Sequence, residues 1–192
     1  MRVPTLLILA LLLFSQVASA LDNNDYRETI TLFNSSPAVQ PYFKNAYGYA
    51  VFPWVGKGGA VVGAAYGEGR VYREHKYAGS SKMYQLSVGA QLGGQAYSEI
   101  IFFKNKEAYD EFTGGSFEFD ASASAVVITA SMHAQTGSTG RSAGASGSAK
   151  TKQIRSGYIN GMAVFTHVLG GLMYEASLAG QQFSFEAAGK QR

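Results

Sequence analysis

The side chains that could carry acid–base or metal chemistry are few and scattered in this sequence. Glu68 and Glu99 stand in apolar, strand-like surroundings, where burial would raise the pKa of a carboxyl group and suit it to proton transfer. The alternative is that each carboxylate pairs with a cation or faces solvent. The histidines, His75, His133 and His167, lie far apart and match no metal-ligand spacing. We therefore predict neither a metal site nor a hydrolase.

The motifs that bind nucleotides are incomplete. Lys57 is followed by Gly58, where a phosphate-binding loop needs Ser or Thr. Gly67-Glu68-Gly69 is only a fragment of the dinucleotide fingerprint, which needs a glycine where Tyr72 stands. The chain has no cysteine, which excludes a thiol nucleophile and a disulfide framework. We predict a protein that is not an enzyme and uses no cofactor.

The first residues have the pattern of a secretory leader. Arg2 precedes the apolar run Leu6–Phe14, and Ala18-Ser19-Ala20 offers a cleavage site of small residues. The apolar run is shorter than the roughly 20 residues that span a bilayer, although an uncleaved N-terminal anchor is the alternative. The sequence predicts a signal peptide at residues 1–20. The exported protein would lie in the periplasm or cell envelope, with secretion as the alternative.

Charge narrows the range of partners. Without Arg2 the 16 Lys and Arg residues become 15, against 13 acidic residues, which is too small an excess for a dedicated nucleic-acid-binding protein. Residues 121–174 contain no Asp or Glu, and this favours contact with an anionic surface. The alternative is a solvated loop with solubilising charges. The cations of this segment are Arg141, Lys150, Lys152 and Arg155.

Helices are predicted at two places. Residues 21–43 form a helical segment in two pieces, because Tyr26, Ile30 and Phe33 share one face and the residues at 35–37, Ser-Ser-Pro, interrupt the pattern. This apolar stripe either covers the core or lies on a membrane. Residues 105–112 form a second helical segment, with Asn105 as its N-cap.

Strands account for most of the remaining chain. Residues 46–103 predict several strands, the first of which ends at Pro53, with a polar turn at 74–82. Glycines inside strands mark bends and close backbone approach. The fold class we predict is therefore α+β, a single domain with a glycine-rich curved antiparallel β-sheet, barrel- or sandwich-like, and a few short flanking helices. Residues 135–149, rich in Gly, Ser and Ala, predict a flexible loop.

Several short motifs follow one another in a fixed order along the chain. They are Val51-Phe52-Pro53, Lys57-Gly58-Gly59, Tyr66-Gly67-Glu68-Gly69, Gly89-Ala90-Gln91, Gly93-Gly94-Gln95, Ile100–Phe103, and Gly171-Leu172 with Ser177-Leu178 and Gly180. In this order they resemble the motifs of the SYLF domain family. Residues 44–187 are similar to the exported bacterial branch of this lipid-binding family, which is related to the yeast Ysc-type actin-binding domain.

The resemblance implies membrane binding through an N-terminal amphipathic helix and basic residues. We predict a non-enzymatic protein that associates with anionic phospholipid membranes of the cell envelope. The alternative is an adaptor that binds a protein partner through its sheet edge or surface, as actin-type binding in the wider family would imply. Trp54 is either an aromatic at the lipid interface or a core residue at a strand end. The predicted lipid-contacting residues are Tyr26, Ile30, Phe33, Lys44, Trp54, Lys57, Arg141, Lys150, Lys152 and Arg155.

Overall fold

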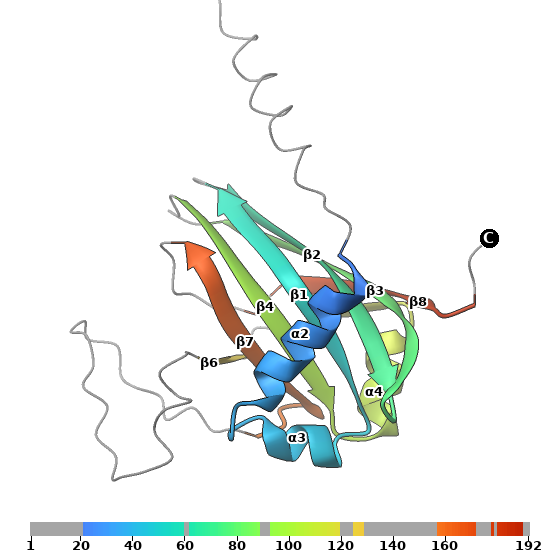
Figure 1. Ribbon diagram of the computed structural model, residues 1–192. Helices are drawn as coiled ribbons and strands as arrows, with labels where there is room; N and C mark the ends of the chain where they lie inside the picture. The colour runs from blue at the N-terminus through green and yellow to red at the C-terminus, as the bar shows by residue number, and fades with distance from the viewer. Residues whose placement is uncertain are drawn as a thin grey trace, which may run out of the picture.

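The computed structural model describes residues 21–59, 62–88, 93–119, 125–128, 157–171, 178 and 180–189. These residues form one sheet with short helices against both of its faces (Figure 1). The helices are α2 (Asn23–Asn34), α3 (Gln40–Asn45) and α4 (Lys106–Thr113). The strands are β1 (Gly48–Gly59), β2 (Val62–Arg73), β3 (Lys76–Val88), β4 (Gly93–Phe103), β5 (Ser116–Glu118), β6 (Ala125–Ile128), β7 (Met162–Gly171) and β8 (Gln181–Ala187).

The strands lie side by side in the order β5-β8-β3-β2-β1-β4-β7-β6. All neighbours are antiparallel except β6, which runs parallel to β7. The predicted α+β class with an antiparallel sheet is confirmed. The described strands form a single sheet with β5 and β6 at its edges, so the sheet has the barrel-like curvature that we predicted but is not closed.

The open sheet is strongly curled. The ring of Phe183 on β8 lies 5.5 Å from that of Phe52 on β1, although two strands separate them in the sheet. Gln181, also on β8, reaches further and donates from Nε2 to Tyr97 and Glu99 of β4. Contacts across so many strands require that one face of the sheet is concave. We call this concave face the inner face and the opposite face the outer face.

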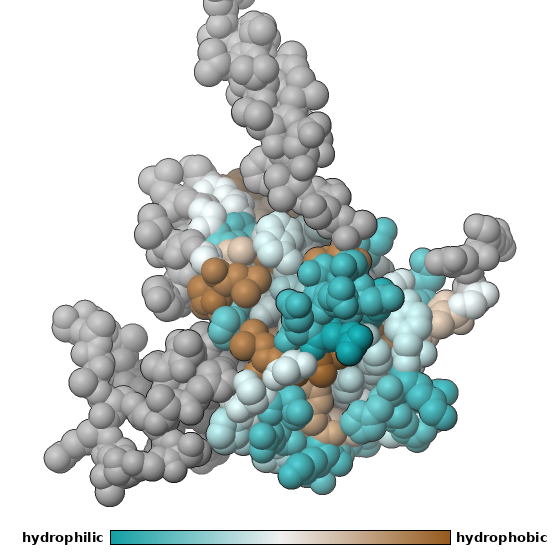
Figure 2. Space-filling view, viewed as in Figure 1, coloured by the Kyte–Doolittle hydropathy of each residue, from teal (hydrophilic) through white to brown (hydrophobic). Residues whose placement is uncertain are grey.

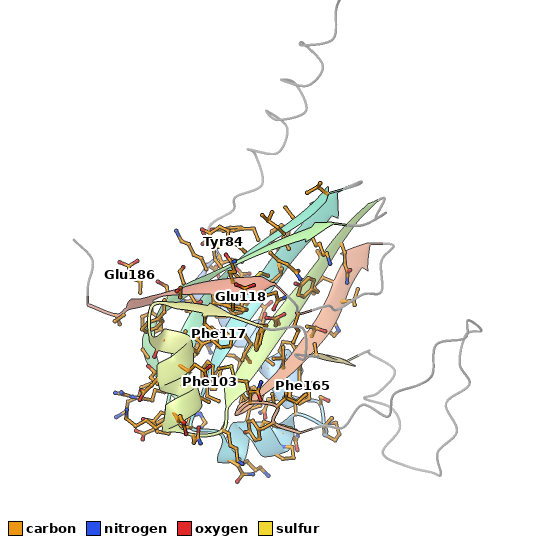
Figure 3. All side chains as sticks on the ribbon, turned by 180° about the vertical axis from the view of Figure 1, so that it is seen from behind. Tyr84, Phe103, Phe117, Glu118, Phe165 and Glu186 are labelled. Carbon is orange, nitrogen blue, oxygen red and sulfur yellow. The ribbon has the colours of Figure 1, made fainter. Side chains whose placement is uncertain are left out.

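Each face carries its own apolar core. The inner core joins Phe52, Ile101 and Phe183 to Phe112 of α4. Figure 3, drawn from behind, shows Phe103 and Phe117 beside α4 on this side. The outer core joins Val51, Phe102 and Phe165 to residues of α2 and α3. Helices cover both faces at the end of the sheet where β1 begins. The central strands are therefore apolar at nearly every position at that end.

β1 does not end at Pro53, as we predicted, but continues to Gly59. The register with β2 shifts by one residue between Val51 and Trp54, which marks a bulge around Pro53. Proline lacks the N–H that a regular ladder requires, and a bulge removes that requirement. The bulge also exchanges the two faces: Phe52 points inward, and beyond the bulge it is Val55 that does so.

The polar turn is also shorter than the residues 74–82 that we predicted. Only Glu74 and His75 form the turn, both with positive φ, and β3 begins at Lys76. The small polar residues that follow in β3 do not interrupt the strand, because their backbone groups pair with β2 and β8.

The predicted helices are confirmed, including the interruption between α2 and α3. α2 is capped by Asp22, whose side chain accepts from the backbone of Asn24 and Asp25 while Asp25 bonds back to Asp22. Asn105 caps α4 as predicted, accepting from the backbone of Ala108. Within the described residues no helix is long and apolar enough to cross a membrane.

Candidate functional site

The two candidate carboxyl groups lie on opposite faces of the sheet. Glu68 is exposed on the outer face, where it accepts a hydrogen bond of 2.5 Å from the hydroxyl of Tyr66. Glu99 is fully buried on the inner face. Because the sheet separates them, the two groups cannot act as an acid–base pair on one substrate.

Glu99 is held by a small polar cluster on the inner face. Gln181 Nε2 donates to Glu99 Oε2 at 3.2 Å and to the Tyr97 hydroxyl at 3.1 Å. Burial raises the pKa of Glu99 to about 7, while the bond from Gln181 lowers it to a smaller extent. The expectation of a raised pKa is therefore confirmed for Glu99. Its second oxygen, Oε1, has no hydrogen-bond partner.

The described histidines do not form a metal site. His75 lies in the turn between β2 and β3, and His167 lies on β7. His133 lies outside the described residues. No group of three potential ligands comes together in the described part of the chain.

The predicted lipid-contacting stripe of α2 packs against the sheet. Tyr26 and Phe33 are buried in the outer core, and Ile30 is partly buried beside them. Arg70 of β2 fixes the start of this helix: its guanidinium lies 4.2 Å from the centre of the Tyr26 ring and donates to Asn23. Of the two uses that the sequence left open for this stripe, the structure displays core packing. Contact of these side chains with lipid would require α2 to leave the sheet.

The predicted cations do not come together with this stripe in the described residues. Lys44 is exposed near the end of α3, before β1 begins, whereas Lys57 is buried on the inner face. Lys57 points inward because it follows the bulge at Pro53, which reverses the alternation set by Ala50 and Phe52. The other four predicted cations, Arg141, Lys150, Lys152 and Arg155, lie outside the described residues.

Trp54 is exposed, as a surface role requires. Its side chain keeps 44% of its accessible area and lies along the outer face over Gly56. A Cβ atom at Gly56 would come within 2.2 Å of the indole ring, so glycine is what allows this position of the ring. Gly56 pairs with Tyr66 of β2, which brings Trp54 next to further aromatic side chains.

These side chains form an exposed group that we did not predict, the outer patch. Tyr66 and Tyr84 are directly opposite each other on β2 and β3, with ring centres 5.2 Å apart. Leu86 is the most exposed member, at 78%. The signal in the sequence was the run Tyr84-Gln85-Leu86, in which large apolar residues occupy the face opposite to a buried polar one. The patch consists of Trp54, Val62, Tyr66, Tyr84 and Leu86.

The outer patch lies beyond the start of α2. Figure 2 views the outer face: the exposed side of the helix is hydrophilic, and hydrophobic residues show on the surface beside it. A hollow of about 1910 Å³ lies at the end of the sheet that carries the outer patch. It is lined by residues of α2, of the outer patch and of the inner face. In Figure 3, Tyr84 lies far from α4, toward the other end of the sheet. The exposed aromatic residues are thus separated from the apolar cores that stabilise the fold.

Comparison with known proteins identifies a matching family and a relative. The model of the family described as "Ysc84: Las17-binding protein actin regulator" matches residues 84–188. Beta cell expansion factor A from Aeromonas veronii is 28% identical over 158 residues, which cover 80% of this chain and 51% of that protein. The chain therefore spans about half the length of this curated relative.

Proposed function

The chain belongs to the Ysc84 family, which is the SYLF family predicted from its sequence, and on this premise we propose that it is a non-enzymatic protein that binds anionic phospholipid membranes of the cell envelope. Lipid or actin-related binding is the general property of the family, and its domains are generally not enzymes. Membrane binding, the lipid type and the location in the envelope are our proposal.

The outer patch is the observation that carries the proposal. Trp and Tyr rings combine an apolar body with a polar tip, which suits them to the interface between lipid headgroups and acyl chains. Leu86 and Val62 project beside them with most of their area exposed. Complete burial of an aliphatic side chain of this size is worth about 1.5–3 kcal/mol, so that a few such residues supply useful affinity.

Charge supports an anionic membrane. The full chain has a formal net charge of +3, and the acid-free residues 121–174 hold Arg141, Lys150, Lys152 and Arg155. Each cation near an anionic leaflet adds about 1 kcal/mol. The predicted leader at residues 1–20 supports a place in the periplasm or cell envelope. In this proposal the side chains of the outer patch insert into the membrane, and the cations attract the protein to the anionic headgroups.

The single tryptophan provides a site-specific test. Vesicles of phosphatidylglycerol and phosphatidylcholine should shift Trp54 emission to shorter wavelength and sediment with the protein, more strongly at about 0.05 M than at about 0.5 M salt. Leu86→Ser should weaken binding because it removes the most exposed apolar side chain of the patch. Tyr77→Ser is the matched control, since Tyr77 is exposed near the other end of β3. Neither blue shift nor sedimentation at low salt would refute membrane binding.

A protein partner is the second candidate, because the matching family is described as Las17-binding. The same outer patch would then contact a protein. Wild-type protein and Leu86→Ser would be used to capture partners from an envelope extract that has been stripped of lipid. Loss of one specific partner with Leu86→Ser, together with unchanged vesicle binding, would favour this candidate over the first.

A further inference from the structure

The hollow at the end of the sheet that carries the outer patch has a floor of small residues on the outer face. Ala64, Gly58 and Gly94 are directly opposite one another on β2, β1 and β4, and all three line the hollow. Among the described residues, a Cβ atom built at Gly94 would meet one neighbouring atom within 4 Å, at 3.6 Å. The space above this floor is therefore open to a molecule that enters from solvent.

Aromatic and apolar side chains of the outer patch form one wall of the hollow. Those that line it are Trp54, Tyr66, Tyr84 and Leu86. Tyr66 and Tyr84 keep 37% and 47% of their area exposed, and their ring centres lie 5.2 Å apart. Trp54 keeps a similar exposed fraction and lies over Gly56, which is opposite Tyr66. A molecule in the hollow would therefore meet three accessible rings.

Carboxyl groups surround the same hollow. Asp25 and Glu28 come from α2, Glu68 comes from β2 and Glu118 comes from β5. Lys57, on the inner face, is the one cation among the described residues that line the hollow. The full chain has a formal net charge of +3, so this excess of acid is local. Four acidic residues against one basic residue favour a cationic ligand.

Glu68 connects the carboxyl groups with the rings. It is directly opposite Trp54 on β1 and accepts a hydrogen bond from the hydroxyl of Tyr66. Lys82 of β3 is opposite Glu68 on its other side, but no ion pair joins the two in the described part of the chain. Aromatic rings attract an organic cation through their faces, and a neighbouring carboxylate adds the opposite charge. The position of Glu68 therefore suits an ammonium group that lies against the rings.

The same charges affect how the outer patch meets a membrane. If the patch inserts into an anionic leaflet, Asp25, Glu28 and Glu68 approach lipid phosphates of the same charge, which is unfavourable. The rings and Leu86 need no carboxylates in order to insert. A positive group between the carboxylates and the phosphates would remove this repulsion. The ammonium group of a zwitterionic lipid headgroup supplies such a charge within the membrane itself.

We propose that the hollow binds one zwitterionic phospholipid, whose ammonium group lies against the aromatic rings of the outer patch and beside Glu68. The acyl chains follow Leu86 into the membrane. The volume of about 1910 Å³ exceeds the roughly 300–1,000 Å³ of a typical small-ligand pocket, so the headgroup and the first part of its chains have room. The inference rests on the proposed function, since the same outer patch contacts the membrane, and it names the headgroup that the patch selects there.

Short-chain lipids that dissolve as monomers test the proposal directly. Dihexanoyl phosphatidylcholine carries an ammonium group, and dihexanoyl phosphatidylglycerol has the same chains without one. Titration followed by the fluorescence of Trp54, the single tryptophan, should show about tenfold tighter binding of the choline lipid, which corresponds to about 1.4 kcal/mol. Contacts between a cation and aromatic rings at a partly exposed site have this magnitude.

Two variants separate the charge and the ring from apolar area. Glu68→Gln keeps the shape of the side chain and removes its charge, and Tyr84→Leu keeps apolar surface and removes the ring. Each should weaken binding of the choline lipid about three- to tenfold and leave binding of the glycerol lipid within about twofold of the wild type. The matched controls, Glu186→Gln and Tyr77→Leu, change exposed residues outside the hollow and should leave both affinities unchanged. All four positions are exposed, so the fold should be retained.

Vesicles distinguish this inference from the membrane proposal on which it rests. Vesicles of phosphatidylglycerol diluted with phosphatidylcholine should bind the wild type more tightly than vesicles with the same fraction of phosphatidylglycerol diluted with diacylglycerol. Glu68→Gln should remove the difference. Equal binding of both vesicle types would overturn the headgroup site and leave membrane binding in place. Sedimentation with neither type would refute membrane binding, while tight binding of the dissolved choline lipid would still support the site.

Three results of the monomer titration would also overturn the proposal. One is equal affinity for the two short-chain lipids. Another is an equal loss of affinity in the control variants. The third is binding of free choline as tight as that of the choline lipid, which would identify a site for a soluble ammonium compound instead of a lipid.

Discussion

Glu99 makes the stability of this protein depend on pH in the opposite direction to most carboxyl groups. Burial raises its pKa from 4.5 to about 7, and the hydrogen bond from Gln181 offsets only part of this effect. In the unfolded chain the same carboxyl group ionises near its ordinary value. Between the two values the unfolded chain has released a proton that native Glu99 keeps, so rising pH favours unfolding.

The size of the effect follows from the shift. Each pKa unit corresponds to about 1.4 kcal/mol, so complete ionisation of Glu99 lowers the free energy of unfolding by on the order of 3 kcal/mol. The full contribution is retained below about pH 4.5 and is lost as the pH rises through about 7. Tyr97 is the titratable neighbour of Glu99, and burial raises its pKa too, so it stays neutral throughout this range.

Urea unfolding of the wild type and Glu99→Gln at about pH 5, 6, 7 and 8 measures this contribution directly. Glutamine has nearly the same shape and does not ionise, so Glu99→Gln should be increasingly more stable than the wild type as the pH rises. The difference should reach on the order of 3 kcal/mol at pH 8. Glu186→Gln, at an exposed position on β8, is the control and should follow the wild type.

Titrations elsewhere in the protein occur in both variants and cancel in the difference between them. A difference in unfolding free energy that is flat from pH 5 to 8 would refute the reasoning. It would mean that Glu99 is as well solvated in the native protein as in the unfolded chain, and the inner face would then not be the water-poor environment that the structure describes.

Two further predictions concern packing. A Cβ atom at Gly69 would lie 2.5 Å from the Phe52 ring, so Gly69→Ala should lower the free energy of unfolding by about 1–3 kcal/mol, whereas Gly170→Ala, with open space at its Cβ, should cost little. Urea midpoints of both variants measure this, and equal midpoints would contradict it. Arg70→Met removes the cation–π contact with Tyr26 and the bond to Asn23, and should speed hydrogen exchange in α2 but not in α4. Equal acceleration in both helices would indicate general destabilisation instead.

The helices could be predicted from sequence because their determinants are local. Asn105 precedes α4 with a cap geometry that needs only the next three residues, and the Ser-Ser-Pro run interrupts the N-terminal helical segment wherever the rest of the chain packs. The family resemblance was equally accessible, since it rests on short ordered motifs. These features do not depend on which strands become neighbours.

Which face of the sheet each residue occupies could not be predicted, because the inward positions of one central strand are mostly glycine and give no hydrophobic pattern. On β2 the inward positions are Gly63, Ala65, Gly67 and Gly69, while Tyr66 points outward, so hydropathy does not reveal the inner face. The reason is visible only in three dimensions. Val55 and the ring of Phe52 occupy the space in which a Cβ atom of Gly67 or Gly69 would lie. Large side chains of β1 thus fill the interior space that side chains of β2 would otherwise occupy.

The bulge at Pro53 determines which residues of β1 are exposed beside the outer patch. If the alternation of Ala50 and Phe52 continued, Trp54 would point inward and Lys57 would point outward, which would be the usual distribution of these residue types. The one-residue shift reverses it, so that Trp54 is exposed and Lys57 is buried. On β3 the same inversion recurs, with Gln85 inside and Tyr84 and Leu86 outside.

This inversion is confined to one end of the sheet. Towards the other end, the inner and outer faces both pack apolar residues against helices. Burial of polar groups beside exposure of aromatic ones costs stability on both faces, so stability does not account for it. An apolar interface that covers the outer patch would account for the exposed aromatic residues. A variant without the bulge, made by deleting Pro53, would exchange the two faces of β1 beyond Phe52, turn Trp54 inward and should lose vesicle binding.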